Sequence, residues 1–521
     1  MNKTRFEVKF EQKDLVTKVY EVKLGVSNDT TLVDISKTDI TGDKELLGAK
    51  LTITDKDDKV IDSWVSTEKT HKIEGLTIGK EYTLTEEIAP DGYAIASSIK
   101  FTINDTNKIQ KVNMKDKIIT MSKVDIGGEE VEGAKIQILD RNGKIVDEWT
   151  STKEEHKIKN LKENEIYTLH EETAPDGFVK ISDVTFKVTD KKENQHIDVV
   201  DKVVIVSKQD IGGNEIEGAK LQVLDLNGNV IDEWISEKES HKVSGLEEGK
   251  NYKLHEEVSI GNFVKATDIE FTVSKEKETQ KVVMIDKLVE VAKTDITNGK
   301  ELEGAELEVT DEEGNVIDKW TSTKEPHQVK GLEEGKTYIL KETTAPYGYE
   351  ITEEIKFVVT TDKEIQKVEM KDMPILNDIT LIKIDADTKE KILDKFTFGL
   401  YEDLECTKLI QQIDSNKDEG TIVFKDLRYG IYYVKEVSAP KGYQKSDKIV
   451  KIEINDKGIF IDDNQIKKDE NEVYSFEFED HLIETPKTGD EGRIRIWLAV
   501  LCVSIIILLG IAIFWKKILG K

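Results

Sequence analysis

Residues 119–202 read ITMSKVDIGGEEVEGAKIQILDRNGKIVDEWTSTKEEHKIKNLKENEIYTLHEETAPDGFVKISDVTFKVTDKKENQHIDVVDK. Short segments of alternating apolar and polar residues are separated by Gly-Gly, Asn-Gly and Pro-Asp-Gly. This pattern is typical of antiparallel strands joined by tight turns. Because few stretches have helical periodicity, the sequence predicts an all-β sandwich for this segment.

The same pattern repeats along the chain. Lys37, Lys123, Lys208 and Lys293 occupy matched positions 86, 85 and 85 residues apart, and a fifth, longer repeat follows. A chain of 521 residues is too long for one hydrophobic core, and this period is too long for a solenoid turn. We therefore expect five small domains with almost no linker between them, which should make a stiff string. Units 1 to 5 are placed at residues 33–117, 118–202, 203–287, 288–373 and 374–482.

Each unit contains a lysine, a glutamate and an aspartate at matched positions. Residues two apart in a strand share a face, so alternation places each of these groups on the same side as apolar neighbours. Ionised groups on a core face cost several kcal/mol each unless they are paired or neutralised, and a triad present in five units is therefore predicted to have a function. The triads are Lys37–Glu86–Asp116, Lys123–Glu171–Asp201, Lys208–Glu256–Asp286, Lys293–Glu342–Asp372 and Lys383–Glu436–Asp480.

Charge and cysteine content limit the classes of function. The net charge of -29 argues against nucleic acid or an anionic membrane surface as a partner. Cys406 and Cys502 are the two cysteines, so the units have no disulfide framework. A string of small extracellular domains then needs another stabilising link, for which the triad is the candidate.

Residues 483–521 combine three features. A TPKTG motif is formed by Thr485, Pro486, Lys487, Thr488 and Gly489. An apolar run at 496–515 and a basic tail at 516–521 follow. Twenty mostly apolar residues suffice to span a bilayer, and the lysines after them place the tail inside the cell.

This three-part order resembles the cell-wall sorting signal of Gram-positive surface proteins. The resemblance implies that a sortase, a membrane cysteine transpeptidase, cleaves between Thr488 and Gly489 and joins the threonine to peptidoglycan. Membrane insertion of the helix would then be transient. The leucine usual before the proline is replaced by Thr485, which leaves the sortase class open. An ordinary single-pass membrane anchor is the alternative.

The N-terminal residues 1–32 have an alternating pattern, with Phe6, Val8 and Phe10 and then Tyr20, Val22, Leu24 and Val26. They contain no apolar stretch long enough for a secretory signal. We interpret them as the remnant of a preceding β domain.

Four units contain a glutamate box that resembles Cna B-type, or SpaA-like, domains, the stalk modules of Gram-positive adhesins and pilins. The fold implied is an Ig-like or prealbumin-like sandwich. Unit 3 departs from the box, because YKLHEEVSIGNF at 252–263 lacks Ala-Pro although Glu256 is kept. The matching boxes are YTLTEEIAPDGY (82–93), YTLHEETAPDGF (167–178), YILKETTAPYGY (338–349) and YYVKEVSAPKGY (432–443).

The resemblance implies that each lysine forms an isopeptide bond with the aspartate of its triad, and that the glutamate assists catalytically. The chemistry is reasonable physically, because desolvation favours a neutral amine and a protonated glutamate. The protonated glutamate can donate to the aspartyl carbonyl oxygen and relay protons as water leaves. A buried ionic triad that never condenses is the alternative. Units 3 and 5 depart most from the family pattern. Unit 3 lacks Ala-Pro in its box, and in unit 5 the glutamate and the aspartate are 44 residues apart instead of 30. The extra residues of unit 5 are interpreted as a lengthened hairpin.

Other recurrent residues are interpreted as structural. His71, His156, His241 and His327 recur without a second recurring histidine, so we expect a structural turn position and no metal site. Trp64, Trp149, Trp234 and Trp320 are expected to pack. The segments 140–143 and 225–228 are read as hairpin turns, because the bidentate glutamate of a calcium loop is missing. No cofactor is expected.

The sequence therefore predicts a non-enzymatic stalk of a wall-anchored surface protein, which holds an adhesive or other N-terminal head away from the wall. One alternative is a sortase-polymerised pilus subunit, although the chain has no Tyr-Pro-Lys-type acceptor motif. Another is the stalk of a surface enzyme whose catalytic domain is missing from this chain. A third is that a unit itself binds a host matrix or cell-surface protein.

Overall fold

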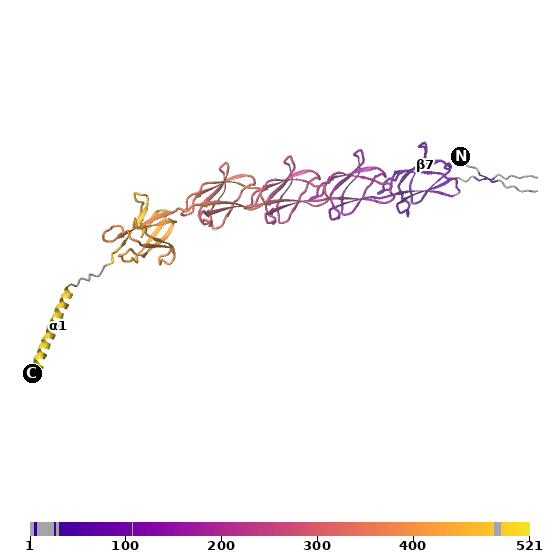
Figure 1. The fold of residues 1–521 in the computed structure, drawn as a ribbon. Helices are drawn as coiled ribbons and strands as arrows, with labels where there is room; N and C mark the ends of the chain where they lie inside the picture. Colours follow the sequence, from indigo (N-terminus) through magenta and orange to yellow (C-terminus); the bar gives the residue numbers. More distant parts are fainter. Residues whose placement is uncertain (1–4, 8–24, 28–30, 107, 484–490, 521) are drawn as a thin grey trace, which may run out of the picture.

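The computed structural model describes residues 5–7, 25–27, 31–106, 108–483 and 491–520. Five β-sandwiches follow one another in a row, and one helix follows the fifth (Figure 1). The row is nearly straight through units 1 to 4 and bends at unit 5. The predicted fold class is thus confirmed: an all-β tandem array followed by one apolar helix.

Units 1 and 2 each pair a three-stranded sheet with a four-stranded sheet. The orders in unit 1 are β6 (His71–Glu74), β3 (Leu32–Asp39), β9 (Gln110–Asp116) and β5 (Val60–Val65), β4 (Lys50–Asp55), β7 (Glu81–Ile88), β8 (Ile99–Thr102). The orders in unit 2 are β13 (His156–Lys157), β10 (Ile119–Val124), β16 (Gln195–Val200) and β12 (Ile145–Thr150), β11 (Lys135–Leu139), β14 (Ile166–Thr173), β15 (Val184–Lys187).

Units 3 and 4 repeat this architecture. The orders in unit 3 are β20 (His241–Lys242), β17 (Val204–Asp210), β23 (Gln280–Asp286) and β19 (Val230–Ile235), β18 (Lys220–Leu224), β21 (Asn251–Val258), β22 (Ile269–Thr272). The orders in unit 4 are β27 (His327–Gln328), β24 (Val289–Asp295), β30 (Gln366–Asp372) and β26 (Val316–Thr321), β25 (Glu306–Asp311), β28 (Thr337–Thr344), β29 (Ile355–Val358).

Unit 5 has a larger second sheet. Its extra residues add two strands in a meander and widen the sheet to six strands, which corrects the expected lengthened hairpin. The orders are β34 (Thr421–Leu427), β31 (Asn377–Asp385), β39 (Tyr474–Asp480) and β33 (Leu409–Asp414), β32 (Thr397–Tyr401), β35 (Gly430–Ser438), β36 (Ile449–Asn455), β37 (Gly458–Ile461), β38 (Asn464–Ile466).

In every unit the first and last strands are parallel neighbours, while the other strand pairs within the unit are antiparallel. Local turn patterns predicted the antiparallel hairpins. They gave no sign of the parallel pair, because its two strands are the ends of the unit and no turn joins them. In the three-stranded sheet of each unit, the first strand therefore lies in the middle and the last strand lies beside it at one edge.

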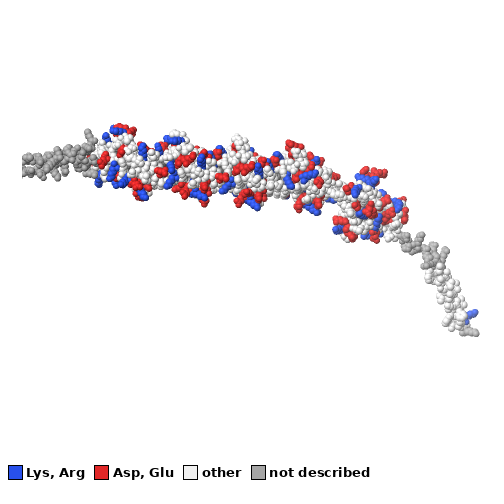
Figure 2. Space-filling model, turned by 180° about the vertical axis from the view of Figure 1, so that it is seen from behind, with Lys and Arg blue, Asp and Glu red and all other residues white. Residues whose placement is uncertain are grey.

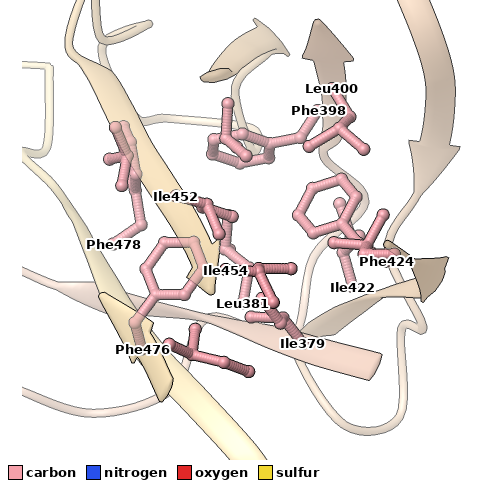
Figure 3. Close-up of a cluster of buried hydrophobic side chains, with 14 of the residues drawn as sticks. Ile379, Leu381, Phe398, Leu400, Ile422, Phe424, Ile452, Ile454, Phe476 and Phe478 are labelled. Atoms are coloured by element: carbon pink, nitrogen blue, oxygen red, sulfur yellow. The ribbon is translucent and has the colours of Figure 1, made fainter. Parts of the chain in front are cut away.

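Each unit has its own hydrophobic core between its two sheets. In unit 5 this core is rich in phenylalanine, and Figure 3 shows Phe398, Phe424, Phe476 and Phe478 converging with aliphatic side chains from both sheets. In units 2 to 4 one residue of the preceding unit joins the cluster: Ala94, Val179 and Val264, respectively. The cores of units 1 to 4 are therefore linked across the junctions.

The surface carries charges of both signs. Figure 2 shows basic and acidic side chains interspersed along the visible face of the five units. On this face the distribution is that of a solvated surface without a large patch of one sign.

The two ends of the chain are described only in part. Strands β1 (Arg5–Glu7) and β2 (Gly25–Ser27) form an antiparallel pair, whereas most of the predicted N-terminal strand pattern lies outside the described residues. At the other end α1 (Glu491–Ile518) includes the predicted span. The most apolar 18-residue window of its segment Ile496–Ile518 has a mean hydropathy of 3.0, so α1 is the one helix of the described residues that is long and apolar enough to cross a membrane.

Candidate functional site

The lysine and the aspartate of each triad come from the parallel strand pair. In unit 1, Lys37 on β3 lies opposite Met114 on β9, and Asp116 follows two residues later on the same face. Strand alternation turns both side chains into the sandwich. The same register places the other four pairs, because each lysine lies opposite the residue two before its aspartate.

The glutamate reaches the pair from the opposite sheet. The Nζ atom of each lysine lies 2.7–2.9 Å from one glutamate oxygen, Oε1. The other oxygen, Oε2, accepts a backbone N–H bond of 2.7–2.8 Å from the segment after the box. The glutamate is thereby fixed with one oxygen aimed at the lysine. The backbone donors are Ala96, Ile181, Ala266, Thr352 and Ser446.

All five lysine Nζ atoms also contact Oδ1 of their aspartates. In unit 5 the distance from Lys383 to Asp480 is 2.6 Å. The structure therefore brings together all fifteen predicted triad residues, including those of unit 3, where Lys208 lies 2.9 Å from Glu256 despite the missing Ala-Pro. The departure in the box does not displace the triad.

The triads are almost completely buried, and no member is more than 4% exposed. The second aspartate oxygen, Oδ2, is buried in all five units and has no hydrogen-bond partner among the described residues. An ionised carboxylate would leave charge on this unpartnered oxygen, which is costly in an apolar interior. The site thus disfavours an ionised aspartate.

The pKa values of the carboxyl groups follow from this burial. Burial raises the pKa of Asp116 to about 8, and those of Asp201 and Asp286 to about 7. It raises the pKa of Asp480 less, to about 6. In unit 4 burial raises the pKa of the glutamate, Glu342. Buried, protonatable carboxyl groups beside an amine are the reactants of an amide condensation.

Unit 5 surrounds its lysine differently. Lys383 Nζ lies 4.2 Å from the ring centre of Phe478 and 5.0 Å from that of Phe398. Aromatic faces stabilise an ammonium ion. The position of Phe478 is occupied by methionine or valine in units 1 to 4: Met114, Val199, Met284 and Met370.

Five segments of the chain match the family model described as the SpaA prealbumin-like fold domain, at residues 31–118, 117–203, 202–288, 287–374 and 377–469. The chain belongs to this family. A comparison with curated proteins gives no match. The five matches together cover most of the chain, and each match corresponds to one unit of the array.

Several solved structures are similar to this SpaA-type array. The Bacillus anthracis TIE protein is 17% identical, with a TM-score of 0.30 over 88% of this chain and 76% of that chain. A C-terminal fragment of the pilus adhesin SpaC from Lactobacillus rhamnosus GG is 15% identical, with a TM-score of 0.28 over 38% and 98%. The Streptococcal ancillary pilin is 15% identical, with a TM-score of 0.22 over 55% and 99%.

The junctions between SpaA-type units 1 to 4 involve residues that the sequence analysis missed. The residue after the triad aspartate is a lysine in units 1 to 3, and its buried amine reaches into the following unit. Lys117 bonds the carbonyl of Thr189, Lys202 bonds the carbonyl of Ser274 and lies 2.8 Å from Glu248, and Lys287 lies 2.6 Å from Thr360 Oγ1. The signal was available, since Asp-Lys recurs at 116–117, 201–202 and 286–287.

A second set of contacts makes these three junctions alike. A glutamate of each following unit, buried in units 2 and 4 and partly buried in unit 3, accepts a backbone N–H bond of 2.9–3.1 Å from the preceding unit. Two backbone hydrogen bonds of 2.8–3.0 Å accompany it at each junction. Successive units are therefore joined by a buried polar interface. The three glutamates are Glu163, Glu248 and Glu334.

The junction between units 4 and 5 has different chemistry. Met373 replaces the junction lysine. Arg428 instead bonds Asp295 and Thr297 of unit 4, and Tyr347 packs edge-on against Tyr429 with ring centres 5.3 Å apart. Burial alone would raise the pKa of Asp295, but the hydrogen bond from Arg428 holds it below its ordinary value. This junction depends on an ion pair between the buried Asp295 and the partly exposed Arg428.

The recurrent histidines and tryptophans form structural pairs. Each histidine ring stacks on its tryptophan with ring centres 4.0–4.2 Å apart. Each histidine Nε2 lies 2.8–3.0 Å from an aspartate on the strand of that tryptophan. The histidines begin short strands and do not lie in turns, which corrects the predicted position. They connect the edges of the two sheets.

The remaining sequence motifs have the following outcomes. The segments at 140–143 and 225–228 are hairpin turns, in which Asp140 and Asp225 accept backbone N–H bonds and Gly143 and Gly228 have positive φ. The sortase motif residues 485–489 lie outside the described residues.

Proposed function

We propose that this chain is the stalk of a surface protein attached covalently to a Gram-positive cell wall, and that each of its five units closes an isopeptide bond. The bonds join Lys37 to Asp116, Lys123 to Asp201, Lys208 to Asp286, Lys293 to Asp372 and Lys383 to Asp480. The stalk would hold an adhesive or other head at its N-terminal end away from the wall.

The observation that carries the proposal is the contact of each buried lysine Nζ with both carboxyl groups of its triad. A buried amine touching a protonatable carboxyl group is held in the arrangement that amide formation needs. The neutral forms of both groups avoid the cost of burying charge. The site thus favours the reactive forms over the ion pair.

The reaction balances with the triad alone. The neutral Nζ attacks Cγ of the aspartic acid and a C–N bond forms. Oδ1 carries the proton of the aspartic acid and receives one Nζ proton through the glutamate, so that the C–Oδ1 bond breaks and Oδ1 leaves as water. Oδ2 remains as the amide carbonyl oxygen. Because each site reacts once, this is self-modification and not enzymatic turnover.

The mechanical consequence follows from the parallel strand pair. An isopeptide bond between the first and last strands would carry tension from one end of a unit to the other without separating its sheets. In unit 1 the bond closes a loop of about 80 residues, which stabilises by about 4.5 kcal/mol in the chain-entropy model. An amide is also insensitive to reductants, unlike a disulfide. These properties suit a stalk under load.

The anchor rests on the three-part C-terminal sequence and on helix α1. The proposed partners are a sortase, which would cleave after Thr488, and peptidoglycan, which would receive the threonine. The junctions of units 1 to 4, with their buried lysines, support a stiff stalk that projects from this attachment point.

Expression in a Gram-positive host that has a sortase tests the anchor. After muramidase digestion, the protein should carry peptidoglycan fragments on Thr488, as determined by peptide mass spectrometry. A Thr488→Ala variant should remain in the membrane fraction. Wild-type protein found only in membranes with residues 489–521 intact would contradict wall attachment, and a sortase-linked ladder of copies would favour a pilus subunit instead.

A further inference from the structure

A short segment after the glutamate box holds the triad glutamate in place. In unit 1 this segment is 94–97. The backbone N–H of Ala96 bonds Glu86 Oε2 at 2.7 Å, and the N–H of Ala94 bonds the carbonyl of Lys117 at 3.0 Å. Lys117 is the residue that follows the triad aspartate. Two alternate residues of the segment therefore fix the triad glutamate and the residue beside the triad aspartate.

The other two residues of the segment bond unit 2. The N–H of Ile95 bonds the carbonyl of Leu161 at 2.8 Å, and the Ile95 carbonyl accepts the N–H of Glu163 at 3.0 Å. The N–H of Ser97 bonds Oε2 of the Glu163 side chain at 2.9 Å. Successive residues of an extended segment face opposite sides. The backbone that orients the triad glutamate of unit 1 is thus held from its other side by unit 2.

The next two junctions repeat this alternation at segments 179–182 and 264–267. The third residue of each segment bonds the triad glutamate of its own unit. The second residue makes two backbone hydrogen bonds of 2.8–3.0 Å to the following unit. The fourth residue donates its N–H to a glutamate of the following unit, Glu248 at 3.1 Å and Glu334 at 3.0 Å. Units 1 to 3 therefore share one arrangement.

Unit 4 keeps the first half of this arrangement and lacks the second. The N–H of Thr352 bonds the triad glutamate, Glu342, as in the other units. Its neighbours Ile351 and Glu353 are exposed, and among the described residues neither makes a hydrogen bond to unit 5. Met373 replaces the junction lysine. The segment that orients the triad glutamate of unit 4 is therefore held by its own unit alone.

We propose that the following unit positions the triad glutamate in units 1 to 3, so that folding of units 2, 3 and 4 accelerates closure of the unit before each of them. Glu163, Glu248 and Glu334 are the positioning residues. None of them touches a reacting atom, and each holds the backbone N–H next to the one that bonds the triad glutamate. Small displacements of a reacting group slow a reaction strongly, so a segment held from both sides should orient the glutamate better than a segment held from one.

This inference rests on the proposed isopeptide closure and adds an order to it. The chain is synthesised from its N-terminus, so units 1 to 3 should each close rapidly only after the next unit has folded. Closure of unit 4 should not depend on unit 5. The order joins the units in a correctly docked array before their bonds become permanent.

Closure can be followed separately in every unit of the full chain. The chain would be synthesised in a cell-free reaction with detergent micelles and quenched at intervals in guanidinium, and crosslinked peptides from each unit would be quantified by mass spectrometry. Glu334→Ala removes the acceptor for the N–H of Thr267. It should slow closure of unit 3 roughly fivefold and leave closure of unit 4, in which it lies, unchanged.

The matched control is Glu333→Ala, because Glu333 is the adjacent residue and pairs with the exposed Lys336. This variant should change closure of neither unit. A residue that only stabilised its own domain would affect unit 4 first, so the effect on the neighbouring unit separates positioning from a structural role.

A second pair of variants decides the matter if Glu334→Ala disturbs the folding of unit 4. Leu169→Asp and Val434→Asp place a charge at matched, fully buried positions in the cores of units 2 and 5, which should unfold those units. Leu169→Asp should slow closure of unit 1, whereas Val434→Asp should leave closure of unit 4 unchanged.

Two results would overturn the positioning role while leaving closure itself intact. One is closure of unit 3 at the wild-type rate in Glu334→Ala. The other is closure of unit 1 that Leu169→Asp slows no more than Val434→Asp slows unit 4. Failure of all five units of the wild-type chain to lose water would instead overturn the proposed function together with this inference.

Discussion

Units 1 to 4 and unit 5 place the same triad in two different cores. In units 1, 3 and 4 a methionine lies beside the lysine, whereas in unit 5 Phe478 and Phe398 present their rings to Lys383. The pKa of the aspartate is raised to about 8 in unit 1 but only to about 6 in unit 5. Burial causes this difference, because it raises the pKa of Asp480 less than that of Asp116. We therefore expect the same triad to close at different rates in units 1 and 5.

The largest expected effect is loss of the triad glutamate. Glu171→Ala and Glu436→Ala should each abolish closure of their own unit, because the proton relay is lost. Unit 2 should then lose about 4.5 kcal/mol of unfolding free energy, measured by chemical denaturation with closure followed by peptide mass spectrometry.

The matched control for unit 2 is Glu172→Ala, because Glu172 is the next residue on the strand and pairs with exposed Lys135. This variant should close normally. Normal closure in Glu171→Ala would show that the glutamate is not needed.

The pH dependence of closure should separate unit 1 from unit 5. An aspartate whose pKa is raised stays neutral to higher pH, and only the neutral acid is readily attacked. Closure should therefore fall as pH rises through about 6 in unit 5 and through about 8 in unit 1. At pH 7 unit 5 should close roughly tenfold more slowly. Time courses on the same chain measure both, and coincident profiles would contradict the role of the core.

Replacing the aromatic ring should make unit 5 behave like the other units. Phe478→Met removes the stabilisation of the Lys383 ammonium, which is worth about 1 kcal/mol, and should speed closure of unit 5 about fivefold. Phe424→Met is the control, because Phe424 belongs to the same core but is not among the rings that Lys383 faces. An equal change in both variants would point to packing and not to the cation–ring contact.

The junctions provide the smallest effect. Lys202→Met copies Met373 and removes the buried amine bonds between units 2 and 3, so the angle between these units should vary more widely in electron micrographs. Arg428→Met should loosen only the junction between units 4 and 5. Lys238→Met, at an exposed site, should change neither. An unchanged angle distribution in Lys202→Met would show that the buried lysine does not stiffen the junction between units 2 and 3.

The sequence predicted the all-β repeat and every triad residue, because strand alternation and turn residues are local and the triad recurs. It could not predict the parallel pairing of first and last strands, which depends on contacts about 80 residues apart. Lys117, Lys202 and Lys287 were missed because an Asp-Lys pair looks like an ordinary strand end.

The most direct test of the central claim is the intact mass of the full chain, purified in detergent before any sortase acts. Five closed units predict a mass lower than that of the sequence by five water molecules. The chain with all five triad glutamates replaced by alanine should have the full mass of its own sequence. A wild-type mass equal to that of the sequence would mean that the triads are ionic, and would contradict the account of a covalently locked stalk.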